Sequence, residues 1–181
     1  MKYRQSILTR DGREVLLRNG EAADGAAVLE NFQSTHAETD YLLTYPDENR
    51  LDPERESRFL ERREESPNEL ELIALADGRV VGTAGIDAIG EKYKVAHRAE
   101  FGVSVLKGYW GLGIGRAMLE TCIQCARDAG YAQLELQVVA DNKRAVAMYQ
   151  KAGFVEYGRN PKGFRSRTAG FQEIISMRLE L

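Results

Sequence analysis

The stretch FGVSVLKGYWGLGIGRAMLETCIQCARDAG, residues 101–130 of 181, carries the pattern that decides the fold. Apolar residues stand at every odd position from 99 to 105, the two-residue period of a strand. From Gly113 to Ala129 the apolar residues recur with helical spacing, and Gly130 suits the end of a helix. The stretch therefore predicts a strand, a glycine loop and a helix in direct succession.

The loop contains three alternating glycines, Gly111, Gly113 and Gly115. Without side chains, its backbone N–H groups can close on an anion, and the positive end of the following helix adds to the attraction. This pattern predicts a cradle for a pyrophosphate, in which Arg116 either adds charge or is a solvated residue of the first helical turn. The alternative is that the glycines only make a tight turn, which three of them between a strand and a helix disfavour.

Two common nucleotide motifs do not fit the loop. A P-loop requires Gly-Lys-Ser/Thr, whereas Gly115 is followed by Arg116 and Ala117. The dinucleotide fingerprint is G-x-G-x-x-G after a first strand, whereas this loop reads G-x-G-x-G in mid-chain. A nucleotide-binding protein is therefore disfavoured.

Outward from this centre, the pattern predicts an α/β chain with a mixed sheet. Asp77-Gly78 is the strongest hairpin signal. We see no repeat or linker, so residues 1–181 are expected to form a single domain. The expected strands cover 15–18, 70–76, 79–84, 96–105, 134–138, 154–157 and 174–179, and the expected helices cover 24–39, 53–65, 113–129 and 142–152.

Composition excludes several classes of function. Hydrophobic residues make up 43% and charged residues 29% of the chain, as in ordinary soluble globular proteins. A formal net charge of -3 gives no basic footprint, so neither nucleic acid nor a membrane surface is an expected partner. No apolar run approaches the ~18 residues of a membrane span, and the N-terminus lacks a secretory pattern, so we expect a cytoplasmic protein.

The cysteines, Cys122 and Cys125, form a CxxC pair within the predicted helix. Zinc would need two more ligands at matching spacing, and a redox pair normally lies at a helix start. We expect two small apolar residues on a buried helix face.

The glycine loop is followed by Asn142, Ala145, Tyr149, Gly153 and Phe154 at fixed spacing, and the two motifs together resemble the GNAT superfamily of N-acetyltransferases, closely over residues 100–154. The family's phosphate motif Q/R-x-x-G-x-G/A is matched by Gly113 and Gly115, with Trp110 departing from Gln or Arg at the first position. Because Trp110 replaces Gln or Arg, a side-chain contact to the phosphates is not expected at that position, whereas the backbone N–H groups of the loop are unaffected. The family's second motif, N-x-x-A-x-x-x-Y-x-x-x-G-F, is matched by Asn142, Ala145, Tyr149, Gly153 and Phe154.

The resemblance implies a mostly antiparallel central sheet flanked by helices, with acetyl-CoA in a V-shaped gap between two central strands. The pantetheine would run beside the backbone of Val103 and Val105. Asn142 would bind the pantetheine arm, or would equally serve as a helix N-cap. The N–H groups implied to meet the pyrophosphate are those of Gly111, Leu112, Gly113, Gly115 and Arg116.

Acetyl transfer to an ammonium requires a base, and Glu100 is our prediction. It faces away from the apolar side of its strand and lies where the superfamily often carries a catalytic glutamate. The alternative is a salt-bridged Glu100 near Arg98 or Lys94. His97 ranks below it as a base, because it should face the other way.

Tyr149 matches the family tyrosine that donates a proton to the departing thiolate. The alternative is a core aromatic, since Tyr149 shares a helical stripe with Ala145 and Ala152. A backbone N–H near Val103 would bind the carbonyl oxygen.

We therefore expect an enzyme that moves an acetyl group from acetyl-CoA to a primary amine without a metal. The second hypothesis is a catalytically silent acyl-CoA-binding or sensory module. The acceptor amine is unidentified and should be shaped by residues 37–45, the segment after Gly158 and residues 162–170. The resemblance is compatible with a homodimer.

Overall fold

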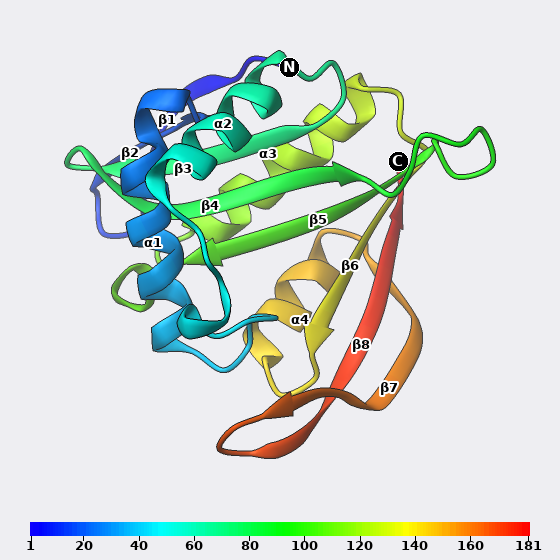
Figure 1. Cartoon of the computed structure of the whole chain (residues 1–181). Helices are drawn as coiled ribbons and strands as arrows, with labels where there is room; N and C mark the ends of the chain where they lie inside the picture. The colour runs from blue at the N-terminus through cyan, green and yellow to red at the C-terminus, as the bar shows by residue number, and fades with distance from the viewer.

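The computed structural model describes residues 1–181 and shows an open eight-stranded sheet with helices on both faces (Figure 1). The strand order is β1-β2-β3-β4-β5-β6-β8-β7, and only the β5–β6 pair is parallel. The predicted α/β class with a mostly antiparallel sheet is confirmed. The strands are β1 (Arg4–Leu8), β2 (Glu14–Asn19), β3 (Leu70–Ala76), β4 (Arg79–Ala88), β5 (Arg98–Val105), β6 (Gln133–Val139), β7 (Val155–Ser166) and β8 (Gly170–Glu180).

Two helices cover each face of the sheet. The helices α1 and α2 pack on β3 and β4 through a small core of Val28, Leu60, Ile73 and Val80. The helices α3 and α4 share the main core with the opposite face, where alternate residues of β3 and β5 point inward. The helices are α1 (Gly25–Glu38), α2 (Pro53–Glu65), α3 (Ile114–Asp128) and α4 (Lys143–Lys151), with single 3-10 turns at Ala22–Asp24, Pro46–Glu48 and Lys107–Tyr109.

The hairpin and helix signals of the sequence are confirmed. Asp77 and Gly78 join β3 to β4 with positive φ angles of 50° and 77°, as a two-residue hairpin turn requires. Pro53 is the first residue of α2, and the Asp52 side chain accepts a hydrogen bond from the N–H of Arg55. These local signals mark the hairpin turn between β3 and β4 and the start of α2.

The strands β5 and β6 separate along their length. They pair at only three positions, from Arg98↔Gln133 to Glu100↔Glu135. Beyond Glu100, β5 stays paired with β4 as far as Val105, whereas β6 stays paired with β8 as far as Val139. The two strands therefore diverge, as Figure 1 shows, and leave the predicted V-shaped gap between them.

The outer strands differ most from the prediction. The sequence pattern misses β1, and it predicts residues 154–157 where β7 runs over Val155–Ser166. Most residues of both strands are exposed, so they lack the apolar alternation that marks a half-buried strand. Inner strands shift by less: β4 continues to Ala88, and β5 begins at Arg98 rather than at residue 96.

The cysteines lie as expected. Cys122 and Cys125 are both buried and free on α3, and burial raises the pKa of the Cys122 thiol. The helices of the chain include none that is both long and apolar enough to cross a membrane.

Candidate active site

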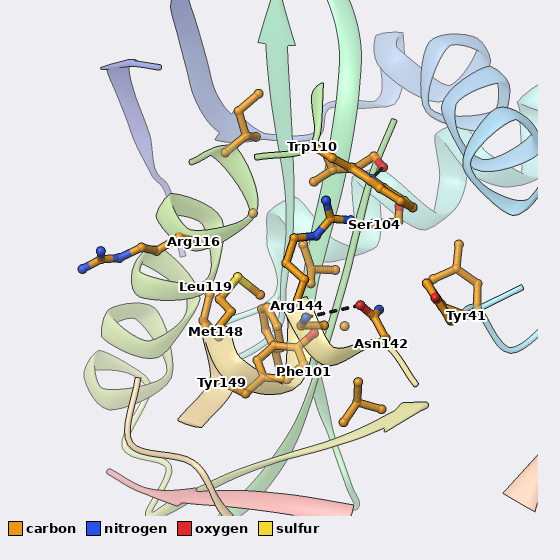
Figure 2. A pocket seen from close by; sticks show the side chains of 18 of the residues that line it. Tyr41, Phe101, Ser104, Trp110, Arg116, Leu119, Asn142, Arg144, Met148 and Tyr149 are labelled. Atoms are coloured by element: carbon orange, nitrogen blue, oxygen red, sulfur yellow. Dashed lines mark hydrogen bonds between the residues drawn. The ribbon is translucent and has the colours of Figure 1, made fainter. Parts of the chain in front are cut away.

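A cavity of about 700 Å³ passes through the gap between β5 and β6. Its α3 side is lined by the glycine loop, α3, α4 and the inward face of β5, and its α1 side by α1, the following segment, β7 and the outward face of β5. Figure 2 shows Arg116 and Tyr41 at these opposite sides. The α1 side contains Thr35, Thr39, Tyr41, Leu42, Leu43, Glu100, Gly102, Ser104, Gln137 and Phe164.

The glycine loop opens into this cavity. Gly111 and Gly113 have φ angles of 80° and 98°, which favour glycine, and Gly113 is the N-cap of α3. A Cβ atom at either position would meet nothing within 4 Å. The unpaired N–H groups at the start of α3 and the open space beside them fit the predicted anion cradle.

Two predicted loop residues contribute less than expected. Leu112 does not line the cavity, and its carbonyl accepts a hydrogen bond of 3.1 Å from the N–H of Arg10. The exposed Arg116 side chain donates from Nε to Glu120 Oε1 at 2.8 Å, and in Figure 2 it points away from the other labelled residues. Arg116 therefore resembles the solvated first-turn residue that the sequence left open, with its backbone still beside the cavity.

Trp110 and Arg144 form a pair that the sequence did not reveal. Trp110 Nε1 donates to the Val105 carbonyl at 2.6 Å, which fixes the indole, and the Arg144 guanidinium lies 4.1 Å from the ring centroid. Arg144 lies one helical turn before Met148, whose sulfur would be 3.9 Å from a Cβ atom at Gly115. The helix α4 thus holds a cation near the glycine loop, where residue 110 supplies none.

We expect Arg144→Ala to weaken acetyl-CoA binding about 10-fold, because one charge-assisted contact to a phosphate is lost. Arg116→Ala is the matched control and should change the dissociation constant by less than about 2-fold, since that guanidinium bonds to Glu120. Isothermal titration calorimetry at two salt concentrations measures both. Equal effects of the two substitutions would contradict a special role for Arg144.

The predicted pantetheine contacts are also at the cavity. Val103, Val105 and Asn142 line it. Beyond Glu100, the edge of β5 that faces β6 has no strand partner, so an extended ligand can pair with it. Asn142 Oδ1 caps α4 by accepting from the Ala145 N–H at 3.2 Å. The cap uses only the oxygen, which leaves the amide N–H groups for a ligand.

Glu100 lies on the α1 side of the cavity with an exposed side chain. Partial burial, and then the charges of Asp87 and Glu135, raise the pKa of Glu100. Those carboxylates belong to the residues opposite Glu100 on the two neighbouring strands. Arg98 pairs with Glu135 through two contacts of 2.5 and 2.9 Å, so the salt-bridged alternative for Glu100 does not occur. His97 is exposed and does not line the cavity.

Tyr149 lines the α3 side of the same cavity and is only 7% exposed. Its ring meets Phe101 edge-on, with centroids 6.2 Å apart. Figure 2 shows the two side chains next to each other. Burial alone raises the pKa of the Tyr149 phenol well above its usual value, and the hydroxyl has no hydrogen-bond partner in the chain. The ring is thus a core residue, while the hydroxyl remains available to a ligand.

The gap therefore assembles nearly the whole predicted site. Phe101 contacts Tyr149 on the α3 side, and the preceding residue, Glu100, points to the α1 side. A group that reaches the gap from the α3 side meets a phenol, and one that comes from the α1 side meets a carboxylate. This arrangement suits proton transfers on the two sides of one reacting centre.

Comparisons with known proteins identify the class. The model of the Acetyltransferase (GNAT) family matches residues 31–154, so the chain belongs to this family. An acetyltransferase of the GNAT family from Streptococcus pneumoniae has a TM-score of 0.88 and 29% identity, with 92% of this chain and 99% of that chain covered. Family membership confirms the predicted enzyme class, an acetyl-CoA-dependent N-acetyltransferase with acetyl-CoA as the cosubstrate.

Other relatives add detail. The L-amino acid N-acetyltransferase AaaT of Escherichia coli is 27% identical over 150 residues, 82% of this chain and 88% of that protein. The [ribosomal protein bS18]-alanine N-acetyltransferase of E. coli is 35% identical over 81 residues, 45% of this chain and 54% of that protein. The structure of yncA from Salmonella typhimurium with its cofactor acetyl-CoA shares the fold, with a TM-score of 0.80, 21% identity and 92% and 94% of the two chains covered.

Proposed function

We propose that the protein transfers an acetyl group from acetyl-CoA to a primary amine by direct attack, with Glu100 as the base and Tyr149 as the acid. One observation carries the proposal: Glu100 and Tyr149 line one cavity from opposite sides of the sheet. This arrangement supports a separate proton transfer for each of the two residues. The relatives named above, which acetylate amino acids or a protein, support an amine acceptor.

The α3 side fits acetyl-CoA. The glycine loop offers N–H groups to a pyrophosphate, and Arg10, Arg144 and Lys151 add positive charge around the same side. The edge of β5 at Val103 and Val105 has no strand partner, although the Val105 carbonyl already accepts from Trp110, and it suits the extended, amide-containing pantetheine arm. The unused amide N–H groups of Asn142 give that arm one further donor.

The chemistry then follows from the position of each group. Glu100 accepts a proton from the ammonium, and the resulting amine attacks the thioester carbonyl carbon. A backbone N–H near Val103 stabilises the oxyanion of the tetrahedral intermediate. When the C–S bond breaks, Tyr149 donates its proton to the sulfur, and the nitrogen of the intermediate returns its second proton to the tyrosinate. The products are the neutral acetylated amine and CoA, and Glu100 releases its proton to solvent.

Glu100→Gln should lower the rate about 10²-fold near neutral pH and recover part of it as the pH rises, because free amine then exists without a base. The wild-type rate should fall on acidification through the raised pKa of Glu100, since only the carboxylate is a base. Initial rates of CoA release from pH 5 to 9 measure both effects.

Asp87→Asn is the matched control for this profile. It removes a like charge opposite Glu100, so the pKa of Glu100 should fall and the acid limb should move to lower pH. The rate at neutral pH should persist. A pH-independent loss in Glu100→Gln, or no loss, would assign Glu100 a structural role only.

Family membership disfavours the silent acyl-CoA-binding module that the sequence left open, and a direct assay separates it from the enzyme. It predicts acetyl-CoA binding without CoA release for any amine in a panel, whereas the enzyme releases CoA with at least one. We retain three further proposals from the sequence: a single domain over residues 1–181, a cytoplasmic location and a homodimer. Size-exclusion chromatography with light scattering tests the last of them.

A further inference from the structure

Charges around the cavity are divided by the sheet. Its cationic lining residues are Arg10, Arg116, Arg144 and Lys151. Arg10 bonds to the glycine loop through the Gly111 carbonyl at 3.4 Å, and Arg116 belongs to α3. Arg144 and Lys151 share the stripe of α4 that includes Met148 and faces Gly115. All four cations therefore belong to the α3 side.

The α1 side has the opposite character. Glu100 is its only charged lining residue. The cations elsewhere on this face do not line the cavity. Arg98 pairs with Glu135 at 2.5 and 2.9 Å, and Arg167 pairs with Asp47 at 2.9 Å. Arg178, opposite Glu135 on β8, lies 3.9 Å from Glu180. The cavity lining on this side therefore contains no cation that could receive an anion beside Glu100.

An apolar wall faces Glu100 across the α1 side. Tyr41, Leu42 and Leu43 come from the segment after α1, and Phe164 comes from β7. Leu43 is 76% exposed, although a leucine side chain gains by contact with an apolar partner. The wall offers such contact to a ligand that enters from this side.

The wall is held in place before any ligand binds. The Asp40 carboxylate, next to Tyr41, accepts hydrogen bonds from the hydroxyls of Ser166 and Tyr45, the latter at 2.6 Å. The Asp40 carbonyl accepts from Gln172 Nε2 at 3.2 Å. These bonds tie the segment after α1 to the β7–β8 hairpin. The wall is therefore ordered before a ligand binds, and ligand binding does not have to supply the free energy of ordering it.

We infer that the acceptor is a primary amine with an apolar, preferably aromatic, substituent and no carboxylate next to the amine. This inference rests on the proposed function and names the acceptor class of that site. The ammonium is attracted by Glu100, and the substituent packs on the wall of Tyr41, Leu42, Leu43 and Phe164. A carboxylate beside the amine would face Glu100 without a cation to compensate, which disfavours free α-amino acids.

Three amines that share one ring test the inference: 2-phenylethylamine, phenylalanine amide and phenylalanine. We expect kcat/KM for the first to exceed that for phenylalanine at least 10-fold. The amide, which has a neutral substituent of similar size, should lie close to 2-phenylethylamine, because charge rather than bulk is excluded. Equal or higher kcat/KM for phenylalanine would overturn the inference, and so would a preference for ethanolamine over 2-phenylethylamine.

A variant tests the missing cation directly. Leu43→Arg places a guanidinium in the wall at a side chain that is already 76% exposed, so the fold should persist. It should raise kcat/KM for phenylalanine relative to 2-phenylethylamine at least 5-fold. Leu8→Arg is the matched control, because Leu8 is 77% exposed on β1 and does not line the cavity. An unchanged preference in Leu43→Arg would contradict the inference.

The proposed function and the inferred acceptor class would be contradicted by different results. If acetyl-CoA binds and no amine in the broader panel is acetylated, the proposed function fails. If amines are acetylated and phenylalanine is the best of them, the function stands and only the acceptor class is wrong.

Discussion

Gly115→Leu is expected to weaken acetyl-CoA binding by at least about 100-fold while the protein stays folded. Gly115 lies in the first turn of α3 and has no positive φ angle, so a leucine causes no backbone strain there. A Cβ atom would lie 3.8 Å from Val105 Cγ2 and 3.9 Å from Met148 Sδ, which is ordinary contact. The remaining carbons of leucine must then extend into the cavity, where they exclude the pyrophosphate from the loop.

This position is a cleaner test than Gly113. Gly113 has a φ angle of 98°, so a leucine there would add backbone strain to the loss of space. Gly115→Ala serves as the control, since its Cβ fits and binding should weaken much less. Calorimetry measures the dissociation constants, and a 100-fold change corresponds to about 2.7 kcal/mol. Unchanged affinity in a Gly115→Leu protein with a native circular dichroism spectrum would remove the loop from the cofactor site.

The central part of the fold could be predicted because each element there carries a local signal. Alternation along β5, glycines in the loop and helical spacing in α3 all indicate the same strand–loop–helix unit. The edge strand β7 has no such signal, because the residues on both of its faces are exposed for most of its length. Its full extent depends on pairing with β8, which sequence periodicity does not report.

The candidate site likewise has one part that the sequence predicts and another part that it does not. Residues that contact a shared cofactor follow spacings that a motif records, and nine of the ten predicted positions line one cavity, Leu112 excepted. The wall of Tyr41, Leu42 and Leu43 has no motif, because its shape depends on Asp40 bonding to the distant Ser166. The place of Arg144 in the site could likewise not be predicted, since only the fold brings its guanidinium over the Trp110 ring.

Division of the cavity by the sheet also bears on how the two substrates of the proposed reaction reach it. Cations and N–H groups on the α3 side favour an anionic cofactor, whereas Glu100 on the α1 side favours a cationic amine. Under the proposed function, the two substrates therefore approach the gap between β5 and β6 from opposite directions. A substitution on one side of the sheet can therefore affect one substrate and leave the other unaffected. The tests on Gly115, for acetyl-CoA, and on Leu43, for the amine, depend on this separation.

Tyr149→Phe is expected to lower turnover by about 10²-fold while acetyl-CoA affinity and stability stay close to those of the wild type. The substitution keeps the ring, and therefore its packing on Phe101 and Phe154. The lost hydroxyl has no hydrogen-bond partner in the chain, so its removal leaves no buried group unpaired. What the enzyme loses is a donor for the departing sulfur.

Tyr131→Phe provides the opposite pattern as a control. Tyr131 is also buried, and its hydroxyl accepts a hydrogen bond of 2.9 Å from Asn68 Nδ2, away from the cavity. Its loss should cost about 1 kcal/mol of stability and leave turnover unchanged. Thermal melting and steady-state rates for the two variants separate a phenol that acts on the substrate from one that supports the core.

The pH profile gives a second criterion for Tyr149. Burial raises the pKa of Tyr149, so its proton is present throughout the neutral range and its removal should move no limb of the profile. The acid limb belongs to Glu100, whose carboxylate must lose its proton to act as a base. We therefore expect Tyr149→Phe to lower the plateau and to leave the acid limb in place. If turnover stayed near the wild-type value where chemistry limits the rate, Tyr149 would be a core residue alone, and the acid would have to be another group or water.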